Sequence, residues 1–196
     1  MTASADRPDE LSTKVVAALD RIARGVRSHR QVIATGAGVT PLQADLMRTV
    51  AEGKPPEAQP SSLAAELGVS QPTASDALGA LVCKGLVRRT ATPGDRRSST
   101  YSLTAPGARV VDDLRHADAV LSESVAALST TDQERALGTL LALISSLLSS
   151  GVLRVARTCP TCRFFEDGRS PRCGLLQAPL APSDYRVNCP EHELSA

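Results

Sequence analysis

Apolar residues recur every three or four positions over most of the first 150 residues. Residues 11–33 show this spacing, which predicts an amphipathic helix. Thr40 followed by Pro41 predicts the start of a second helix. Shorter helices are predicted at 61–67, with Ser61 or Ser62 as its cap, and at 70–85, and a long helical pattern runs over 104–148 with a break near residue 130. The pattern predicts a mainly helical chain.

The two short helices and the segment after them predict a helix-turn-helix with a β-hairpin wing. Ser70 caps the second helix, and Gly85 ends it in a conformation that favours glycine. Residues 86–89 and 101–103 read as short strands that flank a polar tip. In such a motif the second helix enters the major groove of DNA.

Side chains suited to DNA occur at the start of this second helix and along the wing. Small or amide-bearing groups occupy its first turns, where base edges would lie. Residues 84–97 hold five basic residues and one acid, a local charge of +4 in a chain whose net charge is +1. The predicted DNA-binding residues are Ser70, Gln71, Thr73, Ser75, Lys84, Arg88, Arg89, Asp95, Arg96 and Arg97.

Three runs together resemble the MarR family of dimeric winged-helix transcriptional regulators. They are SSLAAELGVSQPTAS at 61–75, LVCKGLVRR at 81–89, and Asp95-Arg-Arg-Ser with the later Leu103-Thr. The resemblance covers residues 10–150. It implies that helices 11–34 and 107–150 form a dimerisation region. It also implies that Arg97 enters the minor groove, while Asp95 pairs with an arginine to orient the wing. Asp76 and the proline-rich loop at 53–60 depart from the family pattern.

The patterns divide the chain into four parts and predict the fold class. These are an N-terminal dimerisation helix (1–39), a winged helix-turn-helix (40–104), C-terminal dimerisation helices (105–152) and a cysteine-rich tail (153–196). We therefore expect a mainly α fold with a small β-hairpin wing, assembled as a dimer. Hydrophobic residues make up 42% and aromatic residues 2% of the chain, which favours packed Ala, Leu and Val helices. No stretch predicts a signal sequence or a membrane span, which favours the cytoplasm.

The tail predicts a metal site built from cysteine. Cys159, Cys162, Cys173 and Cys189 form a C-x2-C-x10-C-x15-C array, and both phenylalanines of the chain follow its first pair. Two thiolates in a C-x2-C turn can bind one ion, and two more complete a four-sulfur set. A segment this rich in proline and poor in apolar residues needs a metal or cross-link to fold.

The identity of the bound group stays open from the sequence. The spacing allows zinc, an iron–sulfur cluster or metal-free redox thiols, and His192 is an alternative to one sulfur in a mixed zinc site. Cys83, inside the second helix of the motif, is read as a buried small side chain.

The sequence thus predicts a sequence-specific DNA-binding transcriptional regulator whose cysteine site senses redox or metal status. Its expected partners are a palindromic operator in double-stranded DNA, a second copy of the chain and a small-molecule effector. One alternative is a repressor that responds to a small molecule and carries a purely structural zinc. A metalloenzyme or electron carrier is the alternative from another class. No catalytic constellation supports an enzyme, so none is expected.

Overall fold

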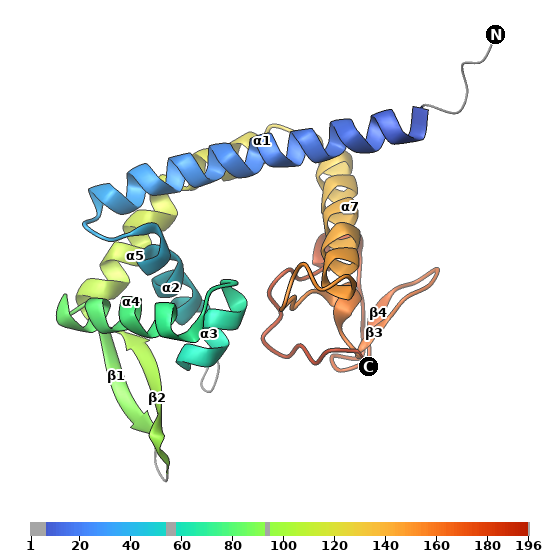
Figure 1. The fold of residues 1–196 in the computed structure, drawn as a ribbon. Helices are drawn as coiled ribbons and strands as arrows, with labels where there is room; N and C mark the ends of the chain where they lie inside the picture. Colours follow the sequence, from blue (N-terminus) through green and yellow to red (C-terminus); the bar gives the residue numbers. More distant parts are fainter. Residues whose placement is uncertain (1–6, 54–57, 93–94, 196) are drawn as a thin grey trace.

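The structure is a computed structural model that describes residues 7–53, 58–92 and 95–195, without the side chains of residues 7–9 and 92–98. The first helix, α1 (Arg7–Gly36), runs as one long rod along the top of the molecule (Figure 1). Thr40 then begins α2 (Pro41–Glu52) with a capping box, because its hydroxyl accepts from the Gln43 N–H while the Gln43 side chain accepts from the Thr40 N–H. Both predicted helices are confirmed.

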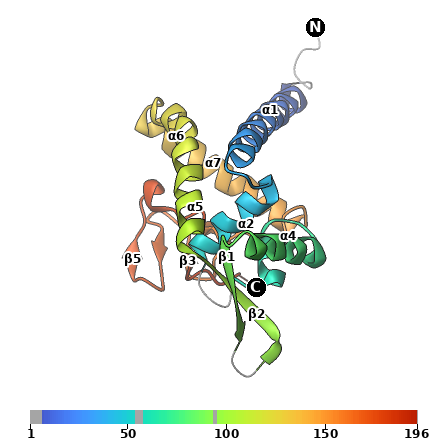
Figure 2. The ribbon, with the colours of Figure 1, turned by 90° about the vertical axis from the view of Figure 1, so that its left-hand side faces the viewer.

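The helix-turn-helix and wing follow in the predicted order. They comprise α3 (Pro60–Glu66), α4 (Gln71–Cys83), β1 (Val87–Thr92) and β2 (Asp95–Leu103), with the two strands paired antiparallel. The strands are longer than predicted and project away from the helices (Figure 2). The predicted cap of α3 is wrong: Gln59 occupies the N-cap without a side-chain bond, because Pro60 supplies the first helical residue.

The helical pattern predicted after the wing forms three helices, with one more break than expected. They are α5 (Ala105–Ala117), α6 (Ala119–Ala126) and α7 (Thr130–Ser149). The unexpected break falls at Asp118, whose carboxylate lies 2.9 Å from the guanidinium of Arg48 in α2. Beyond this break Val125 and Leu128 are 53% and 49% exposed, so this part of the pattern is not buried within one chain.

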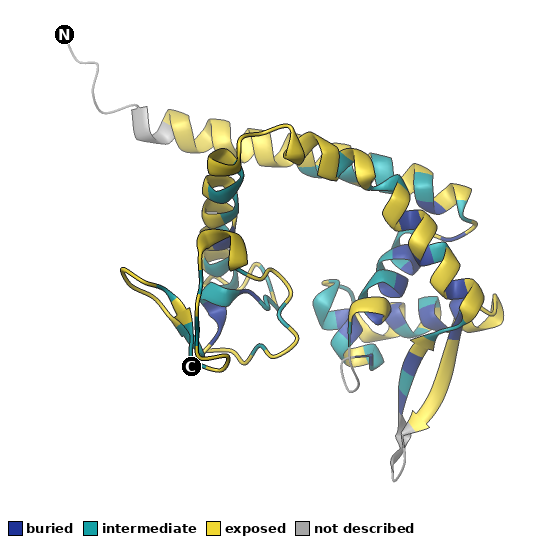
Figure 3. Ribbon diagram, turned by 180° about the vertical axis from the view of Figure 1, so that it is seen from behind, coloured by how far each residue is buried: buried dark blue, intermediate teal, exposed yellow. Residues whose placement is uncertain are grey.

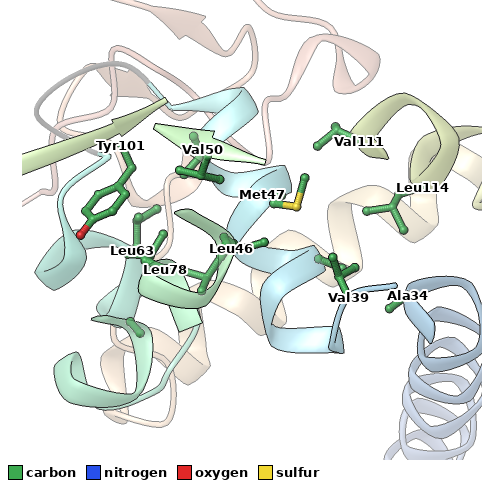
Figure 4. Packing of buried hydrophobic residues seen from close by; sticks show 14 of the residues in the cluster. Ala34, Val39, Leu46, Met47, Val50, Leu63, Leu78, Tyr101, Val111 and Leu114 are labelled. Atoms are coloured by element: carbon green, nitrogen blue, oxygen red, sulfur yellow. The ribbon is translucent and has the colours of Figure 1, made fainter. Parts of the chain in front are cut away.

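Buried apolar side chains gather in one cluster between the helices and the base of the wing. Leu46 and Met47 of α2 lie at its centre, with Leu63 from α3, Leu78 from α4 and Leu114 from α5 around them (Figure 4). Ala74, Leu78 and Leu81 of α4 are buried. Figure 3 shows that burial is concentrated here, whereas α1 and α7 are largely exposed. The core therefore holds α4 and the wing in a fixed relation.

The tail folds into short elements rather than a continuous loop. These are two 3-10 turns, η1 (Cys159–Thr161) and η2 (Pro182–Asp184), and a small antiparallel sheet of β3 (Phe165–Glu166), β4 (Arg172–Cys173) and β5 (Ala178–Pro179). Both 3-10 turns contact α7. No helix in the described part of the chain is long and apolar enough to cross a membrane.

Candidate nucleic-acid interface and cysteine site

The first turns of α4 present polar side chains to solvent. The Ser70 hydroxyl accepts from the Thr73 N–H at 3.2 Å and so fixes the start of the helix. Gln71 and Thr73 are exposed beyond this cap, and Ser75 is half-buried one turn on. Leu78, on the opposite face, is anchored in the core. These are the positions from which a recognition helix reads base edges.

A cleft of about 520 Å³ separates α3 and α4 from the wing. Gln71 and Ser75 line it from α4, and Arg89 lines it from β1. The Arg89 Nε donates to the Ser99 hydroxyl at 2.9 Å, which ties the arginine to the neighbouring strand. The structure thus brings together three of the predicted DNA-binding residues from two elements.

The other predicted DNA-binding residues divide into three groups. Arg88 is exposed on β1. Lys84 is bound within the domain, since its ammonium donates to the Gly38 carbonyl at 2.7 Å and to the Gln43 side chain at 3.0 Å. The side chains of Asp95, Arg96 and Arg97 lie outside the described residues.

Backbone pairing between the two ends of the tail assembles the cysteine site. The Cys159 N–H donates to the Arg186 carbonyl, and the Cys189 N–H donates to the Arg157 carbonyl. Cys173 of β4 pairs with Phe165 of β3, three residues after Cys162. As a result, all four predicted cysteines line one cavity, whose apolar walls are Phe164, Phe165, Leu175, Leu176 and Leu180.

The four thiols are free and influence one another. Burial raises the pKa of the Cys159 thiol, and the other three cysteines raise it further, against the lowering effect of the Arg186 N–H. That N–H donates to the Cys159 Sγ at 3.2 Å. Within the described residues, no three His, Cys, Asp or Glu side chains stand close enough together to share one metal ion.

His192 and Cys83, for which the sequence suggested other roles, both lie outside the lining of the cysteine cavity. His192 does not line it: its Nε2 lies 3.0 Å from the Thr161 hydroxyl, and burial lowers its pKa. Cys83 is exposed at the end of α4, so the reading of a buried side chain is wrong. The core contacts of α4 end at Leu81, before the helix stops.

Sequence reasoning did not find the contact between the tail and the helix-turn-helix. The Arg157 guanidinium lies 3.5 Å from the carboxylate of Glu66 in α3, and both side chains are 24% exposed. Beside this pair, a cleft of about 530 Å³ is lined by Glu52 and Leu67 on one side and by residues 188–190 on the other. No local pattern marks either residue, because the two lie far apart in the sequence.

Comparisons with known proteins support the reading of the helix-turn-helix and its wing. Residues 37–98 match the MarR family model. A MarR family transcription regulator of known structure superposes with a TM-score of 0.66 at 21% identity, covering 76% of this chain and 98% of that one. The fold is the MarR winged helix.

Two further MarR-type structures carry bound molecules. Staphylococcus aureus MepR, in complex with DNA, has a TM-score of 0.58 at 21% identity over 67% of this chain and 96% of that one. Staphylococcus aureus MarR, in complex with salicylate and kanamycin, has a TM-score of 0.61 at 20% identity over 76% and 99%. No curated protein matches the chain.

The MarR comparisons confirm the predicted fold class. MarR proteins are transcription regulators rather than enzymes, in agreement with the expectation for this chain. The family match ends at residue 98, well before the cysteine tail. The tail and its contact with α3 are therefore features that the MarR match does not explain.

Proposed function

We propose that this chain is a DNA-binding transcriptional regulator of the MarR type. The observation that carries the proposal is the juxtaposition of Gln71 and Ser75 on α4 with Arg89 on the wing, around one open cleft. An amide side chain can pair with adenine in the major groove, while an arginine beside it neutralises phosphate. A regulator of this kind acts on chromosomal DNA, so we place it in the cytoplasm.

Selection of bound fragments from random DNA would test this function. We expect a preferred operator, weakened by Gln71→Ala mainly for the preferred sequence. Arg88→Ala and Arg89→Ala should weaken binding to all sequences and flatten the salt dependence by about 0.9 for each phosphate that the variant no longer neutralises. The matched control is Arg135→Ala on α7, where the arginine is exposed in a pair with Asp132. This variant should change neither the DNA affinity nor its salt dependence. Equal binding by wild type and all these variants would overturn the proposal.

We also propose a homodimer on a palindromic operator. The support is the unpartnered apolar surface of α1, where Leu11 and Ile22 are 64% and 63% exposed. Leu140 and Leu147 of α7 are exposed as well. Continuous apolar surface on long helices usually marks an interface between chains. Light scattering should give a dimer for wild type and a monomer for Ile22→Asp, and a wild-type monomer would contradict the proposal.

The four cysteines are proposed as a sensor site for zinc or an iron–sulfur cluster whose occupancy sets DNA affinity. The support is a two-step connection: the backbone of Cys189 is bonded to the backbone of Arg157, and the side chain of Arg157 pairs with Glu66 of α3. A change in the position of the Cys189 segment would thus be transmitted to α3, the helix that precedes α4.

Uncoupling variants would test the sensor role. DNA affinity is measured for protein reconstituted with metal and for protein stripped of it, and we expect the two values to differ in wild type. Glu66→Gln should reduce that difference without abolishing binding. The matched control is Arg163→Ala, which removes a similar pair with Glu193 inside the tail. If the DNA affinity of the wild type does not depend on whether metal is bound, the metal has only a structural role in the tail. A small-molecule effector then becomes the candidate signal.

A further inference from the structure

Lys84, predicted from the sequence to contact DNA, is the C-cap of α4 and bonds to another part of its own domain. Its ammonium donates to the Gly38 carbonyl at 2.7 Å and to the Gln43 side-chain oxygen at 3.0 Å. Gly38 belongs to the turn between α1 and α2, which lies above α4 in Figure 1, while the wing extends below it. The two bonds therefore direct the charge of Lys84 away from the wing.

The groups that accept from Lys84 are themselves held in place by the core. Gln43 is buried, and its side-chain oxygen accepts from the Thr40 N–H at 3.1 Å as well as from Lys84. The turn between α1 and α2 is anchored by the buried side chains of Ala34 and Val39. The Lys84 bonds thus join the end of α4 to a fixed point at the C-terminal end of α1.

Polar bonds fix this end of α4, because the apolar core stops short of it. Leu81 is the last buried residue of the helix, and residues 82–84 are exposed. The Gly85 carbonyl accepts from the Thr104 hydroxyl at 2.7 Å, which ties the next residue to the start of α5. Since both bonds to the turn after α1 come from one ammonium, loss of Lys84 removes this link and leaves the core intact.

We propose that Lys84 is a positioning residue for DNA recognition, which holds α4 in a fixed orientation to α1, and that it does not bind phosphate. This inference rests on the proposed function as a dimeric DNA-binding regulator. Because α1 carries the apolar surface proposed for the dimer, the orientation of α4 relative to α1 sets the separation of the two recognition helices. A dimer binds half-sites whose spacing matches that separation. Lys84 thereby contributes to the choice of operator.

Salt titration of DNA binding separates a positioning role from a phosphate contact. The full chain and its Lys84→Met variant are measured on the selected operator and on unrelated DNA of the same length. A positioning role predicts operator binding weaker by about tenfold, the loss expected of one charge-assisted hydrogen bond. Affinity for unrelated DNA and the slope of log affinity against log salt should stay close to wild type.

A phosphate contact predicts a different result for Lys84→Met. Binding to both DNAs would weaken equally, and the slope would fall by about 0.9 for each phosphate no longer neutralised. Arg88→Ala, which removes an exposed arginine of the wing, is the control that shows this second pattern. The second pattern in Lys84→Met, or unchanged operator binding, would overturn the proposal.

Gln43→Met tests the same link without removing the charge of Lys84. It deletes the oxygen that accepts from Lys84 and from the Thr40 N–H, so it should reproduce the operator defect of Lys84→Met. Thr40→Ala deletes the other half of the capping box and leaves the Lys84 bonds, so this matched control should bind the operator like wild type. Gln43→Glu keeps an acceptor and should also bind like wild type. Additive defects of Lys84→Met and Gln43→Met in the double variant would contradict a shared link.

Operators whose half-site spacing is changed by one base pair complete the test. Wild type should prefer the selected spacing, and Lys84→Met should lose less affinity when the spacing changes. Urea midpoints are compared to show that each variant folds. A wild type that selects no operator overturns the proposed function and this inference with it. A selected operator that Lys84→Met binds with the spacing preference of wild type overturns the inference alone.

Discussion

The winged-helix lobe (residues 34–114) and the cysteine tail (residues 153–195) are stabilised in different ways. Almost every buried side chain of the lobe is apolar, and Leu46, Met47 and Leu78 are fully enclosed. The buried residues of the tail are Thr158, Thr161 and Cys162, within the part of the chain that the structure describes. Removal of apolar surface from water therefore stabilises the lobe but contributes much less to the tail.

In the tail, hydrogen bonds take the stabilising role that buried apolar side chains have in the lobe. The Thr161 hydroxyl donates toward the carbonyls of Ala156, at 2.9 Å, and Thr158, at 3.0 Å, and it lies 3.0 Å from the His192 ring. Each such bond contributes only about 1 kcal/mol net, because water offers the same bonds to the unfolded chain. A domain of this size and composition needs a cross-link as well. We therefore expect the proposed metal site to contribute to the folding of the tail.

If the four cysteines bind a metal as proposed, its removal should give the largest contrast between the two regions. Treatment with a chelator under reducing conditions should leave the tail amides at 159–163 and 186–195 unprotected against hydrogen exchange, because binding energy and folding energy are the same quantity in such a domain. The lobe amides should be unchanged. Protection in the tail that survives full metal removal would contradict the comparison.

Gly107→Ala should cause the largest loss of stability within the lobe. A Cβ at this position, at the start of α5, would lie 1.9 Å from the Leu86 carbonyl oxygen. Since the opposing atom belongs to the backbone, the helix or the wing must shift, and we expect a cost of about 3 kcal/mol or more in urea unfolding. Gly138→Ala in α7, with no atom within 4 Å, is the matched control. It should be neutral or slightly stabilising.

The lobe was predictable from the sequence because local signals and the core agree there. The Ser70 cap and the Gly85 turn are found as predicted, and Leu78 and Leu81 anchor the helix between them in the core. The break at Asp118 was missed, since periodicity continues across it and only a contact with Arg48, distant in sequence, explains it. The His29 ring, 3.0 Å from the Ala117 carbonyl, is another contact between segments distant in sequence that no local pattern marks.

The tail was predictable in chemistry but not in geometry. Cysteine spacing identified the four residues that line the cavity, because coordination chemistry depends on residue type. The small sheet, the role of Arg186 and the position of His192 outside the cavity depend on backbone pairing between the two ends of the tail. No periodic pattern encodes such pairing in strands of two residues.

Asp118→Asn tests how much ion pairing, in addition to apolar packing, contributes to the stability of the lobe. The Asp118 carboxylate lies 2.9 Å from Arg48 and 3.5 Å from Arg30, so it joins α1 and α2 at the end of α5. The asparagine removes the nearer of the two carboxylates beside the largely buried Arg48 guanidinium and leaves Asp45 at 3.5 Å, which should cost about 2 kcal/mol. Asp112→Asn removes an exposed pair with Arg115 and is the control, with an expected effect near zero. Equal urea midpoints for the two variants would show that the joint depends on packing alone.

Thr161→Val should give the smallest effect and test the polar core of the tail most directly. Valine has almost the same shape, so the change removes the hydroxyl bonds to Ala156 and Thr158 and leaves both carbonyls without this donor. We expect a cost of about 1 to 2 kcal/mol, seen as faster exchange of tail amides with the metal bound. Thr139→Val removes a similar bond on the exposed face of α7 and should cost less. If both changes have the same small effect, the cysteine site alone stabilises the tail. A larger effect at Thr161 would show that the hydroxyl network also stabilises the tail.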